Sequence, residues 1–211
     1  MRPENIPQLA LYPTVCAFVQ QHHGMQFADV RAMLRLPTGT GDSRIDTGCN
    51  FAAGSTLCNL ISGISVVFFN RRGRAPGRRK PARDRGRRFT ALLMGYYPWQ
   101  SGENRATKTE ALYKFARNPI VHALGVLQPG DIPFSFNKFA EGQTQAEVDA
   151  LDVAYDAGKA LPPALELVSG RWDLHIPHFY AATVELFRAL VADPQQMQQT
   201  ETCFARGDLI D

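Results

Sequence analysis

The sequence predicts an all-α fold: a single-domain helical bundle of about five to seven helices with one long basic loop. Three observations support this prediction. The chain has 211 residues, a length typical of one domain, so residues 1–211 are assigned to a single unit. Apolar residues recur at helical spacing in several segments, and no segment alternates convincingly as a strand does. A Gly- and Pro-containing basic stretch interrupts these segments.

The first helix is predicted from Pro13 to His23, where Gly24 ends it and the two histidines, His22 and His23, suit the negative end of the helix dipole. Residues 36–48 are rich in Gly, Thr and Asp, which indicates a loop. Asp46 or Thr47 then provides a side-chain oxygen to cap the next helix.

That next helix is predicted from about Gly48 to Asn70, and residues 51–69 carry no charge. A span of this length followed by basic residues also fits a membrane helix, and a membrane-attached protein remains an alternative. Ser55, Asn59 and Ser62 recur every three or four residues and draw a polar stripe along one face. This stripe favours a central helix of a bundle over a membrane-spanning helix, so a membrane partner is not the preferred interpretation.

Residues 71–88 hold ten Lys or Arg and one Asp, although the whole chain has a net charge of only +3. Gly and Pro recur and apolar periodicity is absent, so we expect a mobile loop. Its cations would contact RNA or DNA phosphates without sequence specificity, and the alternative is a solvated loop with no specific role. The candidate nucleic-acid-binding residues are Arg71, Arg72, Arg74, Arg78, Arg79, Lys80, Arg83, Arg85, Arg87 and Arg88.

Further helices are predicted beyond this segment. A short aromatic helix runs from Phe89 to about Trp99, and another from about Asn104 to Ala116. Residues 128–143 are predicted to be a connection. Thr144 and Glu147 form a capping box for a helix to about Leu161, and a last helix runs from about Pro177 to Val191.

The segment Arg117-Asn118-Pro119-Ile120-Val121-His122 carries the clearest chemistry. Asn followed by Pro has the form of a helix start. Arg117 would bind a phosphate and His122 would transfer a proton near neutral pH. Metal-free RNA cleavage through the 2′-hydroxyl needs both an acid and a base, which a single histidine does not supply. A two-fold dimer that pairs two copies of the segment would supply both.

Phe115-Ala-Arg-Asn-Pro-Ile-Val-His122, late in a helix-rich chain, resembles the R-x4-6-H signature of the HEPN superfamily. The resemblance implies a dimeric helical bundle that binds RNA, and in many members a metal-independent ribonuclease of a toxin–antitoxin, antiviral or RNA-processing system. It implies Arg117, Asn118 and His122 as site residues. Any antitoxin or regulator would be a separate chain. The sequence departs from one branch because Ala-Leu-Gly follows His122 where that branch has His-x-Tyr.

Two alternatives to catalysis stay open at this segment. One is a capped helix junction whose arginine pairs with a carboxylate such as Glu110, and the other is a non-catalytic dimeric binding or regulatory module. No cofactor and no metal are predicted, because nucleotide-binding, zinc-protease and hydrolase motifs are absent. Asp173, His175 and His178 are close in sequence, but Pro177 disrupts a shared helical face.

The cysteines are Cys16, Cys49, Cys58 and Cys203, and none forms a CxxC pair. We expect reduced thiols in a cytoplasmic protein without a secretory leader.

Overall fold

The computed structural model describes residues 6–36, 49–69, 82–117, 134–137, 150 and 162–206. These residues are mainly helical, as predicted, but they also form a small three-stranded sheet that the all-α prediction had excluded. In chain order the elements are η2 (Pro7–Leu11), α1 (Pro13–Phe18), η3 (Val19–His23), α2 (Gly24–Arg35), α3 (Asn50–Val67), α4 (Ala82–Tyr96), α5 (Arg105–Ala111), η4 (Leu112–Arg117), β1 (Phe134–Asn137), β2 (Leu165–Val168), β3 (Arg171–His175), α8 (Ile176–Val191) and α9 (Pro194–Ala205).

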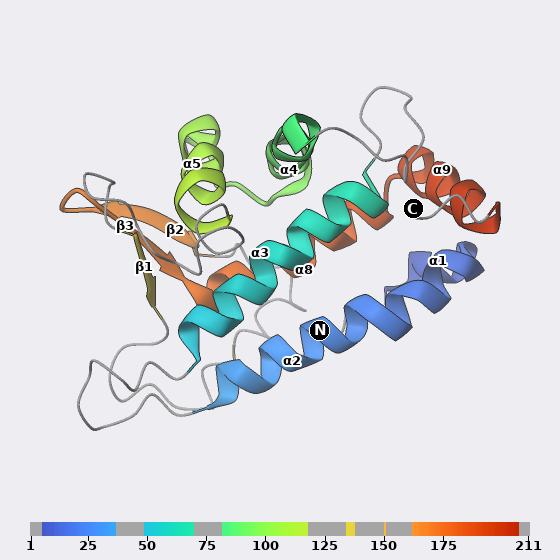
Figure 1. Cartoon of the computed structure of the whole chain (residues 1–211), viewed down its shortest axis with the longest axis horizontal. Helices are drawn as coiled ribbons and strands as arrows, with labels where there is room; N and C mark the ends of the chain where they lie inside the picture. Colours follow the sequence, from blue (N-terminus) through green and yellow to red (C-terminus); the bar gives the residue numbers. More distant parts are fainter. Residues whose placement is uncertain are drawn as a thin grey trace.

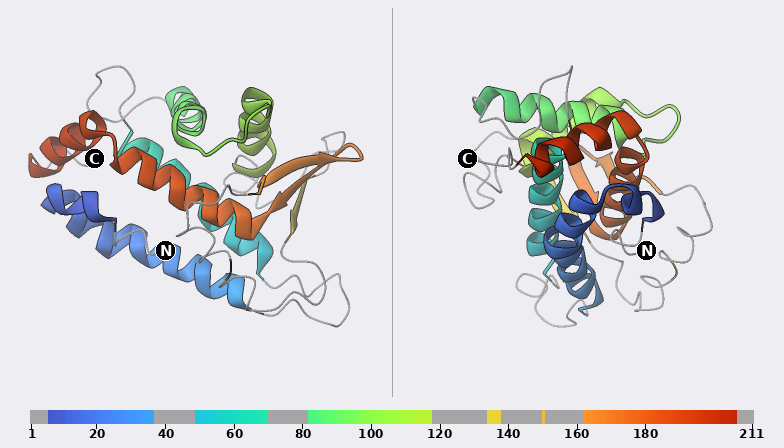
Figure 2. Two further views of the ribbon diagram at one scale, coloured as in Figure 1. Left: turned by 180° about the vertical axis from the view of Figure 1, so that it is seen from behind. Right: turned by 90° about the vertical axis from the view of Figure 1, so that its right-hand side faces the viewer.

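Two helices, α3 and α8, run side by side through the middle of the molecule (Figure 1). The rod formed by α1, η3 and α2 lies on one side of this pair, and α4 and α5 lie on the other (Figures 1 and 2). The sheet closes one end of the bundle and α9 packs on α1 at the other. Phe27, Phe68 and Phe187 are fully buried between the layers.

The N-terminal rod does not end at Gly24, which corrects the prediction made from the sequence. Gly24 has helical dihedrals (φ −58°, ψ −42°), and α2 continues from it to Arg35. The join is the π-helical turn η3. His23 is buried there at 5% exposure instead of lying at a helix end, so the dipole argument does not apply to it. A glycine ends a helix only when it leaves helical dihedrals, and the packed face of α2 holds this one in the helix.

The uncharged helix α3 confirms the prediction for residues 48–70 closely in extent. Its N-cap is Cys49, with a left-handed φ of 62° and no side-chain capping bond, where the sequence had indicated Asp46 or Thr47. The polar stripe lies on its less buried side: Asn59 is exposed, and Ser55 and Ser62 donate to backbone carbonyls four residues earlier.

Helix α3 passes a length and hydropathy test for a membrane span, the one helix among the described residues to do so. However, 56% of it is buried inside the protein, and it contacts α2, α4 and α8. Core helices of soluble proteins pass the same test. The packing therefore favours the bundle-core interpretation over a membrane anchor.

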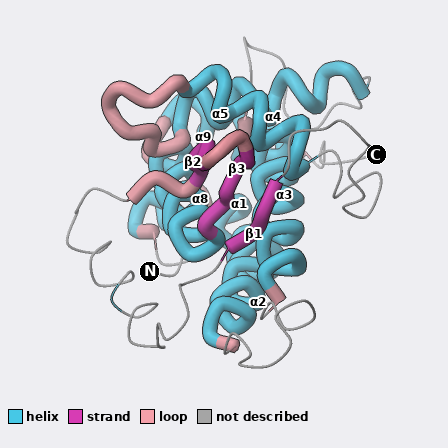
Figure 3. Tube along the Cα trace, turned by 90° about the vertical axis from the view of Figure 1, so that its left-hand side faces the viewer, coloured by secondary structure: helices cyan, strands magenta, loops and turns pink. Residues whose placement is uncertain are grey.

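The sheet has the order β1-β3-β2, with β1 parallel and β2 antiparallel to β3 (Figure 3). Ser169 and Gly170 join β2 to β3 with positive φ values of 50° and 79°, as a two-residue type I′ hairpin turn requires. In β3, Trp172 and Leu174 are buried on one face of the sheet. Arg171 lies on the opposite face and is exposed to solvent. This period of two is the strand pattern.

The sheet is anchored to the bundle where β1 meets the first turns of α3. The Asn50 side-chain amide donates to the Phe136 carbonyl at 3.3 Å. Gly54 lies so close to Phe136 that a Cβ at residue 54 would stand 2.6 Å from the Phe136 ring. Glycine is therefore required at this position by close approach, and not by its dihedrals.

Other predictions have mixed outcomes. The last helix is confirmed as α8, with Pro177 in its first turn, but α9, capped by the Asp193 carboxylate, was not predicted. The connection predicted at 128–143 contains β1. The loop at 37–48 and, apart from Ala150, the helix at 144–161 fall outside the described residues. All four cysteines are free thiols.

Candidate functional site

The helix that leads to the candidate site is formed by α5 and η4. Asn104 caps it by accepting from the Thr107 backbone N–H at 3.1 Å. Ala111 and Leu112 are buried, and η4 packs on α3. The element ends at Arg117, while Asn118 and His122 lie outside the described residues. The structure therefore describes the helix that leads to the predicted site, but not the arrangement of Arg117, Asn118 and His122 relative to one another.

The basic segment is not a loop throughout, because α4 begins at Ala82 and includes the positions of Arg83, Arg85, Arg87 and Arg88. The prediction of a loop to residue 88 is wrong for this part. Phe89, Leu92 and Leu93 are fully buried, and their packed face extends back through Gly86 and Arg88, both buried. Tertiary packing of this face stabilises a helix from Ala82 onward, although the Gly- and Arg-rich composition of this part had indicated a loop.

The remaining candidate cations, Arg71, Arg72, Arg74, Arg78, Arg79 and Lys80, lie outside the described residues.

Arg87 and Arg88 have different environments although they are adjacent. Arg87 is exposed on α4. Arg88 is 3% exposed, and its guanidinium donates to the Val66 carbonyl of α3 at 3.3 Å. Arg88 thus joins two helices, and only Arg87 of the two is available to a ligand at the surface.

Helix α4 lies against α5 and η4 and contacts them at two places along its length. At one end, Gly86 faces Tyr113: a Cβ on residue 86 would overlap the Tyr113 hydroxyl. The rings of Phe89 and Tyr113 have centroids 5.7 Å apart. At the other end, the Thr109 hydroxyl lies 3.6 Å from the Met94 sulfur. The C-terminal end of the basic segment is therefore held beside the helical element that ends at Arg117.

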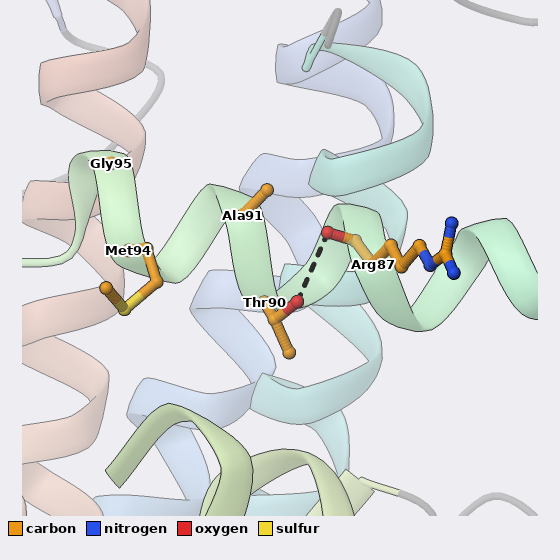
Figure 4. Close-up of a pocket in the computed structure, with 5 residues that line it drawn as sticks. All are labelled: Arg87, Thr90, Ala91, Met94 and Gly95. Carbon is orange, nitrogen blue, oxygen red and sulfur yellow. Dashed lines mark hydrogen bonds between the residues drawn. The ribbon is translucent and has the colours of Figure 1, made fainter. Parts of the chain in front are cut away.

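A shallow, open hollow of about 600 Å³ lies on the surface of α4. Its described lining consists of Arg87, Thr90, Ala91, Met94 and Gly95, all from this one helix (Figure 4). The Thr90 hydroxyl bonds to the carbonyls of Gly86 and Arg87 at 3.1 and 3.2 Å. Met94 is 42% exposed, which is high for a large apolar side chain. The hollow thus has a small-residue, apolar floor with a cation at one end.

The sequence did not indicate this hollow. The positions 87, 91 and 95 are spaced by four, which places them on one helical face, but the segment was divided between a loop and a short helix. A glycine at position 95 inside a helical pattern was the available signal in the sequence.

His175 and His178 meet at the junction of β3 and α8, with ring centroids 3.8 Å apart. The His178 backbone N–H donates to His175 Nδ1 at 3.4 Å and so caps α8. His178 Nδ1 lies 3.3 Å from the Pro163 carbonyl oxygen, which only accepts, so this nitrogen carries the proton. Burial, with a smaller effect of His178, lowers the pKa of His175 to about 4.

Both imidazoles therefore have structural partners at this junction. In the described part of the chain, no three His, Cys, Asp or Glu side chains are grouped so as to hold a metal ion.

Comparison of the chain with protein-family models, with curated proteins and with solved structures finds no match.

Proposed function

We propose that this protein binds RNA and cuts it without a metal ion, at a site formed by Arg117, Asn118 and His122 and completed by a second copy of the chain. Arg117 holds the scissile phosphate and stabilises its developing charge. His122 of one copy acts as the base and His122 of the other as the acid. Asn118 orients the imidazole or the phosphate.

The observation that carries the proposal is the contact of α4 with η4. The Gly86–Tyr113 approach and the Phe89–Tyr113 ring pair bring the end of a strongly basic segment beside the element that ends at Arg117. Cations next to a phosphate-cleaving site raise the local concentration of RNA and offset the repulsion between phosphates. A capped helix junction alone gives no reason for this placement of charge.

The test compares cleavage of total RNA in EDTA by the wild type, His122→Ala and His22→Ala. His22 is an exposed histidine of η3. The rod of α1 and α2 that contains η3 lies on the side of α3 opposite to α4 (Figure 1), so the His22 variant is the matched control. We expect the wild type and His22→Ala to cut RNA at equal rates. His122→Ala should cut at least about 100-fold more slowly, because general acid–base catalysis typically contributes 10²–10⁴-fold.

The binding of RNA by His122→Ala, measured separately by fluorescence anisotropy, should remain within about twofold of the wild type, because Arg117 and the basic segment supply most of the electrostatic attraction. Equal cleavage by the wild type and His122→Ala would exclude this site as the source of the activity. RNA binding without any cleavage by the wild type would leave a non-catalytic binding module.

A further inference from the structure

We propose that the hollow on α4 binds one unpaired base of a single-stranded RNA, with the flanking phosphate on Arg87. This inference rests on the proposed RNA-binding function and adds the substrate class: RNA whose bases are free, and not a duplex.

The shape and chemistry of the hollow fit a flat, largely apolar group. Its volume of about 600 Å³ is within the range of ~300–1,000 Å³ found for small-molecule sites, although it is largely open to solvent and its described lining comes from α4 alone. Ala91 and Gly95 provide a floor without bulky side chains, and the exposed Met94 provides a polarisable wall. A base laid on this floor buries apolar surface without displacing protein atoms.

The charge at the hollow favours a nucleic acid as the occupant. Arg87 lines one end and is exposed, so its guanidinium can bind a phosphate bidentately. Ten of the residues at 71–88 are Lys or Arg, which continues the same charge along the chain. Duplex RNA keeps its bases stacked inside the helix, whereas single strands expose them for contacts with side chains.

The location agrees with a substrate that also reaches Arg117. The Arg87 end of the hollow is next to Gly86, which touches Tyr113. Tyr113 precedes Arg117 by four residues in the same helical element, a rise of roughly 6 Å. The floor residues Ala91 and Gly95 lie five to nine residues beyond Gly86, a further rise of roughly 8–14 Å in the direction of Thr109. At about 3.4 Å per stacked nucleotide, the bound base would therefore be roughly four to six nucleotides from the phosphate at the cleavage site.

Gly95→Leu tests the hollow directly. A Cβ at residue 95 has no neighbouring heavy atom within 4 Å, so the leucine fits and covers the floor. Ala189→Leu, at an exposed position of α8, adds an apolar side chain elsewhere and is the matched control. Thermal melts followed by circular dichroism should show that neither variant is destabilised.

The probe is a fluorescent 12-nucleotide single strand of 2′-O-methyl RNA, which cannot be cut through its 2′-hydroxyls. We expect Gly95→Leu to weaken binding severalfold, because the leucine side chain occupies the surface on which the base lies. Ala189→Leu should bind like the wild type.

An abasic nucleotide moved along the probe identifies the base that is held. At one position it should weaken binding to the wild type as much as Gly95→Leu does, and it should cause no further loss in Gly95→Leu, because both changes remove the same contact. If Gly95→Leu binds the intact probe like the wild type, or if the two losses multiply at every position, the base subsite is wrong, and a hollow that serves a protein partner would give this result.

The failures of the two proposals are distinguishable. If the wild type binds no RNA of any kind, both proposals fall; if it binds RNA without cutting it, only the cleavage site falls; and if it binds and cuts RNA but Gly95→Leu has no effect, only the base subsite falls.

Discussion

Gly54→Ala should lower the free energy of unfolding by about 1–3 kcal/mol, the usual cost of forcing extra volume into a packed contact. The added methyl would stand 2.6 Å from the Phe136 ring and 3.2 Å from the Ile176 side chain. It therefore separates β1 and the start of α8 from α3. Urea unfolding followed by circular dichroism measures the change.

The same substitution at Gly63, in the same helix, is the matched control with the opposite expected sign. The nearest atom to a Cβ at residue 63 is His23 Nε2 at 4.0 Å, an ordinary contact. Gly63→Ala should therefore raise stability by up to about 1 kcal/mol, the gain in helix propensity. Adding Phe136→Leu to Gly54→Ala should recover part of the loss. Equal effects of alanine at the two glycines would contradict the docking of β1 on α3.

Acidification from pH 7 to pH 5 should lower the free energy of unfolding, because the folded protein buries histidines in their neutral form. Burial, with a smaller effect of His22, lowers the pKa of His23 to about 4, and its Nδ1 has no hydrogen-bond partner. The unfolded chain therefore binds more protons than the folded chain between pH 4 and pH 6.5. Stability is fully present above pH 6.5 and is lost as the pH falls toward 4, by about 1–3 kcal/mol for His23.

His175 and His178 add to this loss with the same sign. Burial and the neighbouring His178 lower the pKa of His175 to about 4. Burial lowers the pKa of His178 as well, against the opposing effects of the Pro163 carbonyl and Glu166. A proton on His175 Nδ1 would also break the cap of α8.

His23→Leu isolates the buried histidine. Its free energy of unfolding should depend less steeply on pH between 7 and 5 than that of the wild type, because a leucine takes up no proton. His22→Leu, at the exposed neighbour, should flatten the slope much less, because it removes only the smaller effect of His22 on the pKa of His23. This window lies above the range in which most carboxylates titrate. An unchanged slope in His23→Leu would show that His23 is not a buried neutral group.

The helices that could be predicted are those with a local cause. The spacing of apolar residues indicated α3, α5 and α8, and Asn104 caps α5 through a contact three residues away. The start of α4 could not be predicted in this way. Gly86 is helical because it lies against Tyr113, which is remote in sequence, and a run of Arg, Gly and Asp gives no local sign of that contact.

The strands were missed because their pairing is not local. β1 pairs with β3 across an interval of more than thirty residues, for example Phe134 with Trp172, and each strand is only four or five residues long. The local signals were the alternation from Arg171 to His175 and the Ser169-Gly170 turn. The proximity of Asp173, His175 and His178 in sequence instead drew attention to metal binding.

For the candidate site, the residues that would act could be proposed from the sequence, whereas the helices that pack beside them are known only from the structure. Arg117, Asn118 and His122 followed from the chemistry of phosphate cleavage and from the HEPN resemblance. That α4 lies beside η4, that Arg88 is buried while Arg87 is exposed, and that a hollow follows from Arg87 to Gly95 all depend on helix packing.

The central claim is a cleavage site shared by two copies of the chain, and it is tested by diluting the wild type with an inactive partner. Wild type and His122→Ala are coexpressed in varied ratios, and RNA cleavage in EDTA is measured at constant total protein. If both histidines are needed, only dimers of two wild-type chains are active, so an equal mixture should retain about a quarter of the activity. Retention of about half would mean that each chain cuts alone, and would contradict the shared site.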